Sequence, residues 1–224
     1  MIRLSFNAAK PVYLLGCGGH GRVVLDALRA AGITVHGIID GALPRGERVE
    51  GVAVVGADDY LAQLDPRATA VCIGVGVMPG KPRRAQLFAS CANEGFQLID
   101  VIHPSAIISP RHTFGVGVQV LAGAVVQPAV SVGDNVIINT RASIDHDCIL
   151  ENDVMIGPGA IVCGEVRIGA GAYVGAGAVI LPGVQIGRDA TIGAGSIVTR
   201  DIVQGTTVTG NPAAARTSGG QPHA

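Results

Sequence analysis

The sequence contains no tryptophan, and aromatic residues of all kinds make up only 3% of its 224 positions. A core centred on large rings is therefore not expected, and aliphatic side chains have to supply the buried surface. Mean hydropathy is high, at +0.45, yet no uninterrupted apolar run is long enough to span a bilayer. We expect the apolar residues to be buried in protein, with no membrane partner.

Patterns for disulfides, metals and nucleic acids are missing as well. The five cysteines are odd in number, scattered and without CxxC spacing, which predicts reduced thiols and no metal site. Sixteen Lys and Arg oppose 17 Asp and Glu, so nothing favours a nucleic-acid partner. Residues 1–15 show no signal-peptide cleavage pattern, and we expect a cytoplasmic protein.

An aliphatic residue recurs every six positions from Ile102 to Val203, through seventeen consecutive hexads of which only Phe114 breaks the rule. The fifth hexad position is mostly small, as at Ala124, Ala142 and Ala160. Glycine often follows the aliphatic residue, where we expect a turn that needs a residue without a Cβ. These three features together define the repeat that the fold has to accommodate.

A parallel β-helix accommodates this repeat, because short strands stack about 4.8 Å apart and the aliphatic residue fills the interior. An α-helix cannot hold a period of six, and frequent glycine would destabilise it. A low-complexity or collagen-like segment is the alternative, which the regular frame argues against. Three hexads would form one coil, so the seventeen hexads give between five and six coils.

The first hundred residues alternate apolar runs with helical patterns. Strands are expected at 11–15, 34–39, 52–55, 70–73 and 97–102, and helices at 22–31, 58–64 and 81–94. This order predicts a small Rossmann-like βαβαβ sheet. The predicted organisation is an α/β domain over 1–101, a β-helix over 102–210 and a C-terminal tail over 211–224 that includes His223.

A glycine-rich loop follows the first predicted strand. Gly16, Gly18 and Gly21 satisfy the pattern G-x-G-x-x-G, and Asp40 follows at the end of the second predicted strand. Backbone N–H groups at the start of a helix can bind an anion such as a pyrophosphate. A nucleotide sugar, a nicotinamide dinucleotide and a purely structural turn all remain open, and the small domain favours the nucleotide sugar. His20 lies within the loop, where it would face the bound molecule.

Polar residues are concentrated between Ile138 and Ile149, in the segment INTRASIDHDCI. His146 is the third residue of its hexad and should point outward, with Asp147 beside it. Histidine can take a proton near neutral pH, and a carboxylate can orient it. An exposed pair of this kind is often only solvated, but a flat β-helix face shared with another subunit would turn it into the wall of a cleft. Cys148, at the fifth position, should be buried and not a nucleophile.

The motifs GCGGHGRVV, INTRASIDHDC and GNPAAAR occur in that order around the hexads. The combination resembles the left-handed β-helix sugar acyltransferases, in particular the N-acetyltransferases that form UDP-N-acetylbacillosamine and GDP-N-acetylperosamine. Sialic acid O-acetyltransferases share much of the pattern. The resemblance extends from about Val12 to Arg216, and the left hand of the β-helix is taken from it.

The resemblance implies a role for each matching residue. His146 would be the general base, with Asp147 as its partner and Asn139 nearby for the substrate. The nucleotide sugar would be held by Gly18, Gly19, His20, Asp40, Gly41 and Gly74. Acetyl-CoA, the co-substrate, would lie along the later coils near Gly164, Ala176 and Ala194, in a homotrimer with its sites between subunits.

Two positions depart from the family pattern. Residues 73–78 read IGVGVM, where relatives often have Ile-Gly-Asn-Asn or Ile-Gly-Asp-Asn. Met155 stands where many relatives have a histidine thought to touch acetyl-CoA, and it is therefore not among the predicted site residues.

The function expected from these features is acetylation of the 4-amino group of a UDP- or GDP-linked 4-amino-4,6-dideoxy sugar in glycan biosynthesis. No buried nucleophile is apparent, so direct attack of the amine on the thioester is expected. The alternatives are a sialic acid type O-acetyltransferase, a nicotinamide-dependent enzyme and a β-helix that serves only assembly.

Overall fold

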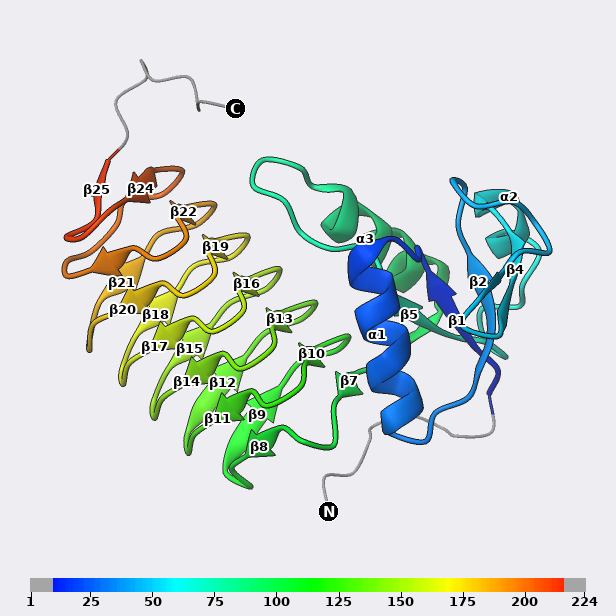
Figure 1. Ribbon diagram of the computed structural model, residues 1–224, viewed down its shortest axis with the longest axis horizontal. Coiled ribbons are helices and arrows are strands. Elements are labelled where there is room, and N and C mark those ends of the chain that lie inside the picture. Colours follow the sequence, from blue (N-terminus) through cyan, green and yellow to red (C-terminus); the bar gives the residue numbers. More distant parts are fainter. Residues whose placement is uncertain (1–9, 216–224) are drawn as a thin grey trace.

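The computed structural model describes residues 10–215, which form an α/β part followed by a parallel β-solenoid (Figure 1). The solenoid coils stack side by side, and the α/β part lies against the end where the first coils begin. His223 and residues 216–224 of the predicted tail lie outside the described residues. The expected fold class, an α/β domain before a solenoid of hexapeptide repeats, is confirmed.

The α/β part is a six-stranded sheet in the order β3-β4-β2-β1-β5-β6, with all pairs parallel except β3 with β4. Its strands are β1 Val12–Leu15, β2 Val35–Ile39, β3 Arg48–Val49, β4 Val52–Gly56, β5 Ala70–Ile73 and β6 Gln97–Leu98. Its helices are α1 Gly19–Ala30, α2 Asp58–Leu61 and α3 Arg83–Glu94.

Two details of the α/β part differ from the expectation. The hairpin of β3 and β4 was not predicted, and its turn has Glu50 and Gly51 at φ values of 48° and 85°, as a tight hairpin requires. The single strand expected over 97–102 is divided. β6 pairs with β5 in the α/β sheet, whereas β7 (Val101–Ile102) pairs with β10 in the solenoid.

The solenoid has three faces, each a stack of short strands. The first face contains β7 Val101–Ile102, β10 Gln119–Val120, β13 Ile137–Ile138, β16 Met155–Ile156, β19 Tyr173–Val174, β22 Thr191–Ile192, β24 Thr207–Thr209 and β25 Ala214–Ala215. The second contains β8 Ile107–Ile108, β11 Val125–Val126, β14 Ser143–Ile144, β17 Ile161–Val162, β20 Val179–Ile180 and β23 Ile197–Val198. The third contains β9 His112–Phe114, β12 Val130–Val132, β15 Ile149–Leu150, β18 Arg167–Ile168 and β21 Gln185–Ile186.

Neighbouring coils pair in a register of three hexads, as the repeat predicted. Ile137 pairs with Met155, and Ser143 pairs with Ile161. From Val118 to Val198, the residues at the first and fifth hexad positions are buried in one continuous core, in which Ile144, Cys148 and Ile156 are fully covered. The aliphatic period therefore marks the inside of the solenoid.

The glycines that follow the aliphatic residue serve a purpose other than the expected turn. A Cβ at Gly157 would lie 2.7 Å from the backbone nitrogen of Ala176, and one at Gly175 would lie 2.5 Å from that of Ala194. These glycines therefore allow adjacent coils to approach closely. The left-handed backbone, with positive φ, falls two positions later in the hexad, as at Asp147 and Gly177.

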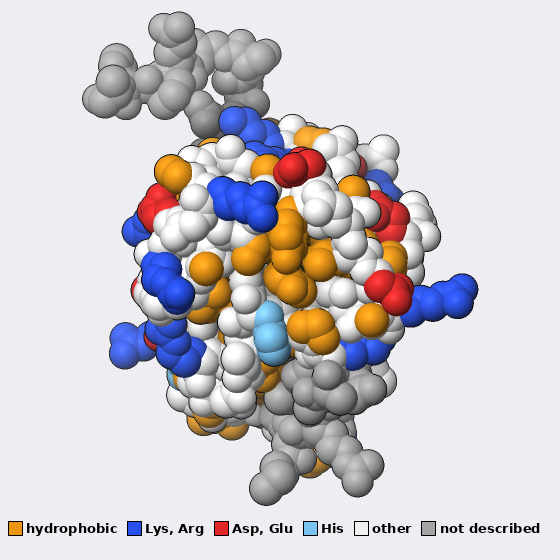
Figure 2. Space-filling view, turned by 90° about the vertical axis from the view of Figure 1, so that its right-hand side faces the viewer, with side chains coloured by type: hydrophobic (Ala, Val, Ile, Leu, Met, Phe, Trp, Pro, Cys, Tyr) orange, Lys and Arg blue, Asp and Glu red, His pale blue; other side chains and the backbone are white. Residues whose placement is uncertain are grey.

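No helix within residues 10–215 is long and apolar enough to cross a membrane. Figure 2 shows the side of the molecule formed by the α/β part, where apolar side chains group near the middle and charges of both signs surround them. On that side Lys and Arg cover more of the surface than Asp and Glu do.

Candidate functional site

His146 and Asp147 form a hydrogen-bonded pair at the corner between the second and third faces, just after β14. The Nδ1 of His146 lies 2.8 Å from Oδ2 of Asp147, and the two side chains are 53% and 59% exposed. Asp147 adopts a left-handed backbone conformation with φ of 59°, which aspartate tolerates better than most residues. The predicted outward orientation of His146 is confirmed.

The imidazole of His146 rests on Gly164 in the next coil. A Cβ at Gly164 would lie 2.6 Å from Cε1 and 2.7 Å from Nε2 of His146. The backbone confirms this stacking, because the amide of Glu165 donates to the carbonyl oxygen of His146 at 2.9 Å. Gly164 is buried, so it leaves space for the ring in addition to any contact that it makes with acetyl-CoA.

The pair is suited to accept a proton. The hydrogen bond to Asp147 is the main cause that raises the pKa of His146, and the negative charges of Asp145, Asp147 and Glu165 act in the same direction. Desolvation, the second cause in size, opposes them by lowering the pKa. A base of this kind is neutral only above the raised pKa, and it binds a proton more strongly than an isolated imidazole.

Cys148, next to the pair, is not activated as a nucleophile. Its thiol is buried and donates to the carbonyl oxygen of Cys163 at 3.0 Å. Burial is the main cause that raises its pKa to about 11, so the reactive thiolate is scarce at neutral pH. Within residues 10–215, no cluster of three His, Cys, Asp or Glu side chains could hold a metal ion.

Asn139, Ala176 and Ala194 lie at a different corner, between the first and second faces. Asn139 follows β13, and its Oδ1 accepts a hydrogen bond from the amide of Thr140 at 2.8 Å. Ala176 and Ala194 lie in later coils of the same corner and are exposed. Within one subunit, these residues are therefore apart from His146 and Gly164, which share the corner between the second and third faces.

The glycine loop lies at the start of α1, and its glycines have different surroundings. Gly18 and Gly19 are exposed, and a Cβ at either would have no atom within 4 Å. A Cβ at Gly74 would lie 2.0 Å from the carbonyl oxygen of Gly16. Gly74 therefore lets the loops after β1 and β5 pack together, whereas Gly18 and Gly19 leave open space where a ligand can approach the helix N-terminus.

Asp40 connects the glycine loop to the loop after β2. Its Oδ2 accepts from the amide of Cys17 at 2.6 Å, and its Oδ1 accepts from the amide of Ala42 at 2.7 Å. Gly41 beside it is exposed. The structure thus brings the predicted nucleotide-sugar residues of three loops together at the carboxyl ends of β1, β2 and β5, the usual ligand position in a parallel sheet.

His20 is partly buried and turns toward the solenoid. Its Nε2 lies 2.8 Å from Oε1 of Gln119, which belongs to β10. Burial is the main cause that lowers the pKa of His20, the positive charge of Arg84 lowers it further, and the bond to Gln119 opposes both. His20 is therefore neutral near physiological pH, in contrast to the more basic His146.

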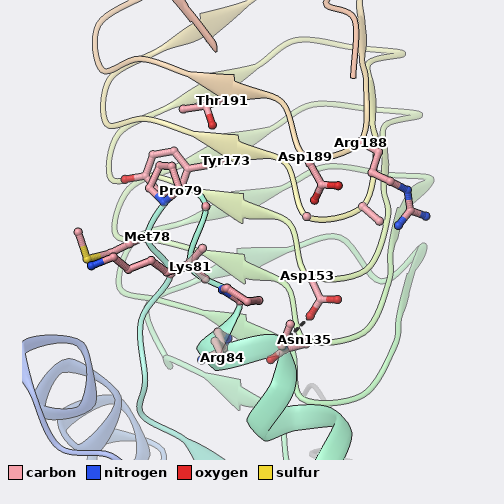
Figure 3. A pocket seen from close by; sticks show the side chains of 16 residues that line it. Met78, Pro79, Lys81, Arg84, Asn135, Asp153, Tyr173, Arg188, Asp189 and Thr191 are labelled. Carbon is pink, nitrogen blue, oxygen red and sulfur yellow. Dashed lines mark hydrogen bonds between the residues drawn. The ribbon is translucent and has the colours of Figure 1, made fainter. Parts of the chain in front are cut away.

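A cavity of about 390 Å³ lies between the loop after β5 and the solenoid, and Figure 3 shows that its side chains come from both. None of the predicted site residues lines it. Arg84 lies at its base, and its Nη1 donates to the carbonyl oxygens of Ile73 and Val75 at 3.0 and 2.8 Å. The cavity is separate from the corner that carries His146.

Comparisons with known proteins agree with these two parts of the chain. Residues 11–87 match the PglD N-terminal domain, and residues 147–181 and 165–200 match the bacterial transferase hexapeptide repeat.

Solved structures extend the likeness over the whole chain. A histidine-to-asparagine mutant of perosamine N-acetyltransferase from Caulobacter crescentus, in complex with CoA and GDP-perosamine, is 36% identical, with a TM-score of 0.87 over 97% of this chain and 100% of that one. The chain belongs to this family of hexapeptide-repeat sugar N-acetyltransferases. A further member, the acetyltransferase domain of PglB from Neisseria gonorrhoeae FA1090 in complex with acetyl coenzyme A, is 36% identical, with a TM-score of 0.85 over 92% of this chain and 99% of that one.

Within this family fold, the sequence alone did not reveal two contacts. Gln119 reads as an ordinary residue before an aliphatic hexad position, and only the packing of the two parts brings it to His20. Gly164 was predicted to contact acetyl-CoA, but its contact with His146 was missed. The period of three hexads could have shown that contact, because His146 and Gly164 occupy the same hexad position in consecutive coils.

Replacing Gly164 by alanine should displace the imidazole of His146 and lower turnover roughly 100-fold, since small misplacements of a reacting group are costly. Pro182→Ala, at the same hexad position one coil later, is the matched control and should keep full turnover. Steady-state kinetics and thermal unfolding of both variants measure the effect. Full turnover in folded Gly164→Ala would show that this contact does not position the imidazole for the reaction.

Proposed function

We propose that the protein transfers an acetyl group from acetyl-CoA to the 4-amino group of a UDP- or GDP-linked 4-amino-4,6-dideoxy sugar. The observation that carries this is the exposed His146–Asp147 pair at 2.8 Å, in a chain 36% identical to a perosamine N-acetyltransferase that is bound to CoA and GDP-perosamine. The open glycine loop supports a substrate that carries a pyrophosphate.

In the proposed reaction, the neutral sugar amine attacks the thioester carbonyl directly. A C–N bond forms, the C–S bond breaks, and CoA leaves as the thiolate, which becomes the thiol when it receives the proton that has left the nitrogen. His146 takes the proton that the nitrogen loses, and Asp147 orients the imidazole and stabilises its charged form. The high pKa of the Cys148 thiol favours this route over an acyl-cysteine intermediate.

The outer surface of the second face supports assembly into a homotrimer. Five of its six outward residues are aliphatic, and among them Ile107 and Ile161 are 68% and 46% exposed. The third face instead presents polar residues such as Ser131, Arg167 and Gln185. An apolar strip of this kind is typical of a surface covered by further copies of the chain.

A threefold arrangement would also complete the site. If the second face of each subunit turns toward the axis, the corner between the second and third faces of one subunit meets the corner between the first and second faces of the next. His146 would then lie opposite the Asn139, Ala176 and Ala194 of a neighbouring subunit. The catalytic pair and the predicted acetyl-CoA residues Ala176 and Ala194, which are apart in one chain, would then share one cleft.

The choice of acceptor tests the proposed function. The amine of a UDP- or GDP-linked 4-amino sugar should give a much higher kcat/KM than a hydroxyl of free sialic acid. Release of CoA thiol measures both reactions, and NAD in place of acetyl-CoA is the control for a nicotinamide enzyme. A preference for sialic acid would replace the proposal by an O-acetyltransferase.

In a profile of kcat/KM against pH, Asp147→Asn should move the acid limb, where activity is lost as His146 is protonated, to lower pH. It should also reduce turnover. The hydrogen bond to Asp147 is the main cause of the raised pKa of His146, so its loss leaves a weaker base that becomes neutral at lower pH. His146→Ala should remove this limb and cut turnover roughly 10²- to 10⁴-fold. An unchanged profile in Asp147→Asn would show that His146 is not the titrating base.

Ile161→Arg should dissociate the trimer, because it places a charge at the centre of the apolar second face. Ile149→Arg, at the same hexad position on the third face, is the control and should leave the assembly intact. Light scattering should give three times the chain mass for the unaltered protein and the control. A monomer in the unaltered protein would contradict both the interface and the shared cleft.

A further inference from the structure

His20 and Gln119 connect the α/β part to the first coils across 99 positions of sequence. His20 lies in the first turn of α1, two positions after the open Gly18, and its Nε2 is 2.8 Å from Oε1 of Gln119. Gln119 belongs to β10 and is only 1% exposed. The solenoid therefore contacts the proposed nucleotide-sugar loop through one buried amide.

The orientation of that amide is fixed by its other end. The Nε2 of Gln119 donates to the carbonyl oxygen of Ile73 at 2.7 Å. Turning the amide over would place the Oε1 of Gln119 against the carbonyl oxygen of Ile73, and both of these atoms only accept hydrogen bonds. The Oε1 of Gln119 must therefore face His20, and because this oxygen cannot donate, the hydrogen between them belongs to Nε2 of His20.

The other nitrogen of the ring is then left as an acceptor. A neutral histidine carries one ring proton, so a hydrogen on Nε2 leaves Nδ1 unprotonated. Within the described residues, no hydrogen bond to Nδ1 of His20 is formed, and the side chain remains partly exposed. Burial is the main cause that lowers the pKa of His20 and keeps the ring neutral, and the positive charge of Arg84, itself buried, lowers the pKa further.

The same polar contacts hold the loop after β5. The carbonyl oxygen of Ile73 accepts from both Gln119 and Arg84, and Arg84 also binds the carbonyl oxygen of Val75. Gly76 in this loop packs on the Cβ and Cγ atoms of His20, since a Cβ there would lie 3.1 and 3.4 Å from them. His20 is therefore held on two sides, by Gln119 and by Gly76.

We propose that Gln119 is a positioning residue, which fixes His20 as the Nε2–H tautomer so that Nδ1 accepts a hydrogen bond from a hydroxyl or amino donor of the nucleotide-linked sugar. This inference rests on the proposed function for its substrate. Gln119 acts through His20 and touches no reacting atom. Through Gln119, the first coils of the solenoid therefore help to position a side chain of the acceptor site.

The tautomer can be measured without any substrate. In protein with ¹⁵N-labelled histidine, the ring resonances of His20, assigned by their loss in His20→Asn, should show a protonated Nε2 and an unprotonated Nδ1. In Gln119→Met, both tautomers should be populated. A protonated Nδ1 in the unaltered protein, or an unchanged ring in Gln119→Met, would overturn the proposal.

Kinetics then test the consequence for binding. Gln119→Met should raise the KM for the nucleotide-linked sugar about tenfold, the usual cost of one hydrogen bond, and leave the KM for acetyl-CoA unchanged. Gln185→Met, the same change at an exposed glutamine in the same hexad position on the third face, should alter neither value. Equal KM values for the sugar in both variants would overturn the role in positioning.

Gln119→Glu keeps the shape of the side chain in case Gln119→Met fails to fold. The carboxylate cannot donate to the carbonyl oxygen of Ile73, and its charge favours a doubly protonated His20 whose Nδ1 donates. The ring resonances should then show two protonated nitrogens at neutral pH.

If no nucleotide-linked amino sugar is a substrate, the proposed function fails, while the tautomer measurement still decides the role of Gln119 in fixing His20.

Discussion

Backbone hydrogen bonds between stacked coils are the constraint on which the rest of this structure depends. Each strand pairs with the strand three hexads further on, so residues at the same hexad position form columns along a corner or a face. His146 lies over Gly164 for this reason, and the carbonyl oxygen of Gly164 accepts in turn from the amide of Gly183 at 3.0 Å. The proposed base therefore stands on a rigid backbone and needs few supporting side chains.

The α/β part depends on the solenoid for its position. Leu121, a solenoid residue, is fully buried in the same core cluster as Val12, Leu28 and Val101. The division of residues 97–102 between the α/β sheet and the first coil leaves almost no linker between the two parts. Because the junction is packed and short, the glycine loop is held at a fixed place relative to the first coils, where His20 meets Gln119.

Much of the architecture was predictable because its signals are local. The aliphatic residue every six positions predicted the interior of the solenoid, and the outward position of His146 followed from counting within its hexad. The glycine loop predicted the turn from β1 into α1. The hairpin of β3 and β4 escaped prediction because a strand as short as β3 contains too little periodicity to recognise. The sequence showed the glycines that follow the aliphatic residues but not the reason for them. They are needed because adjacent coils approach closely there, and the atoms in contact belong to another coil of the solenoid.

The sequence by itself determined the solenoid, the order of its columns and the place of the His146–Asp147 pair, because a short repeat dictates which side chains point inward and which point outward. The structure shows that Gly164 lies beneath the imidazole of His146 and that Asn139 occupies another corner, and both follow from the period of three hexads. Only the tertiary structure decided that Gln119 contacts His20, because this contact joins residues 99 positions apart through the packing of two different folds. No local pattern encodes such a contact, since it depends on how the completed parts fit together.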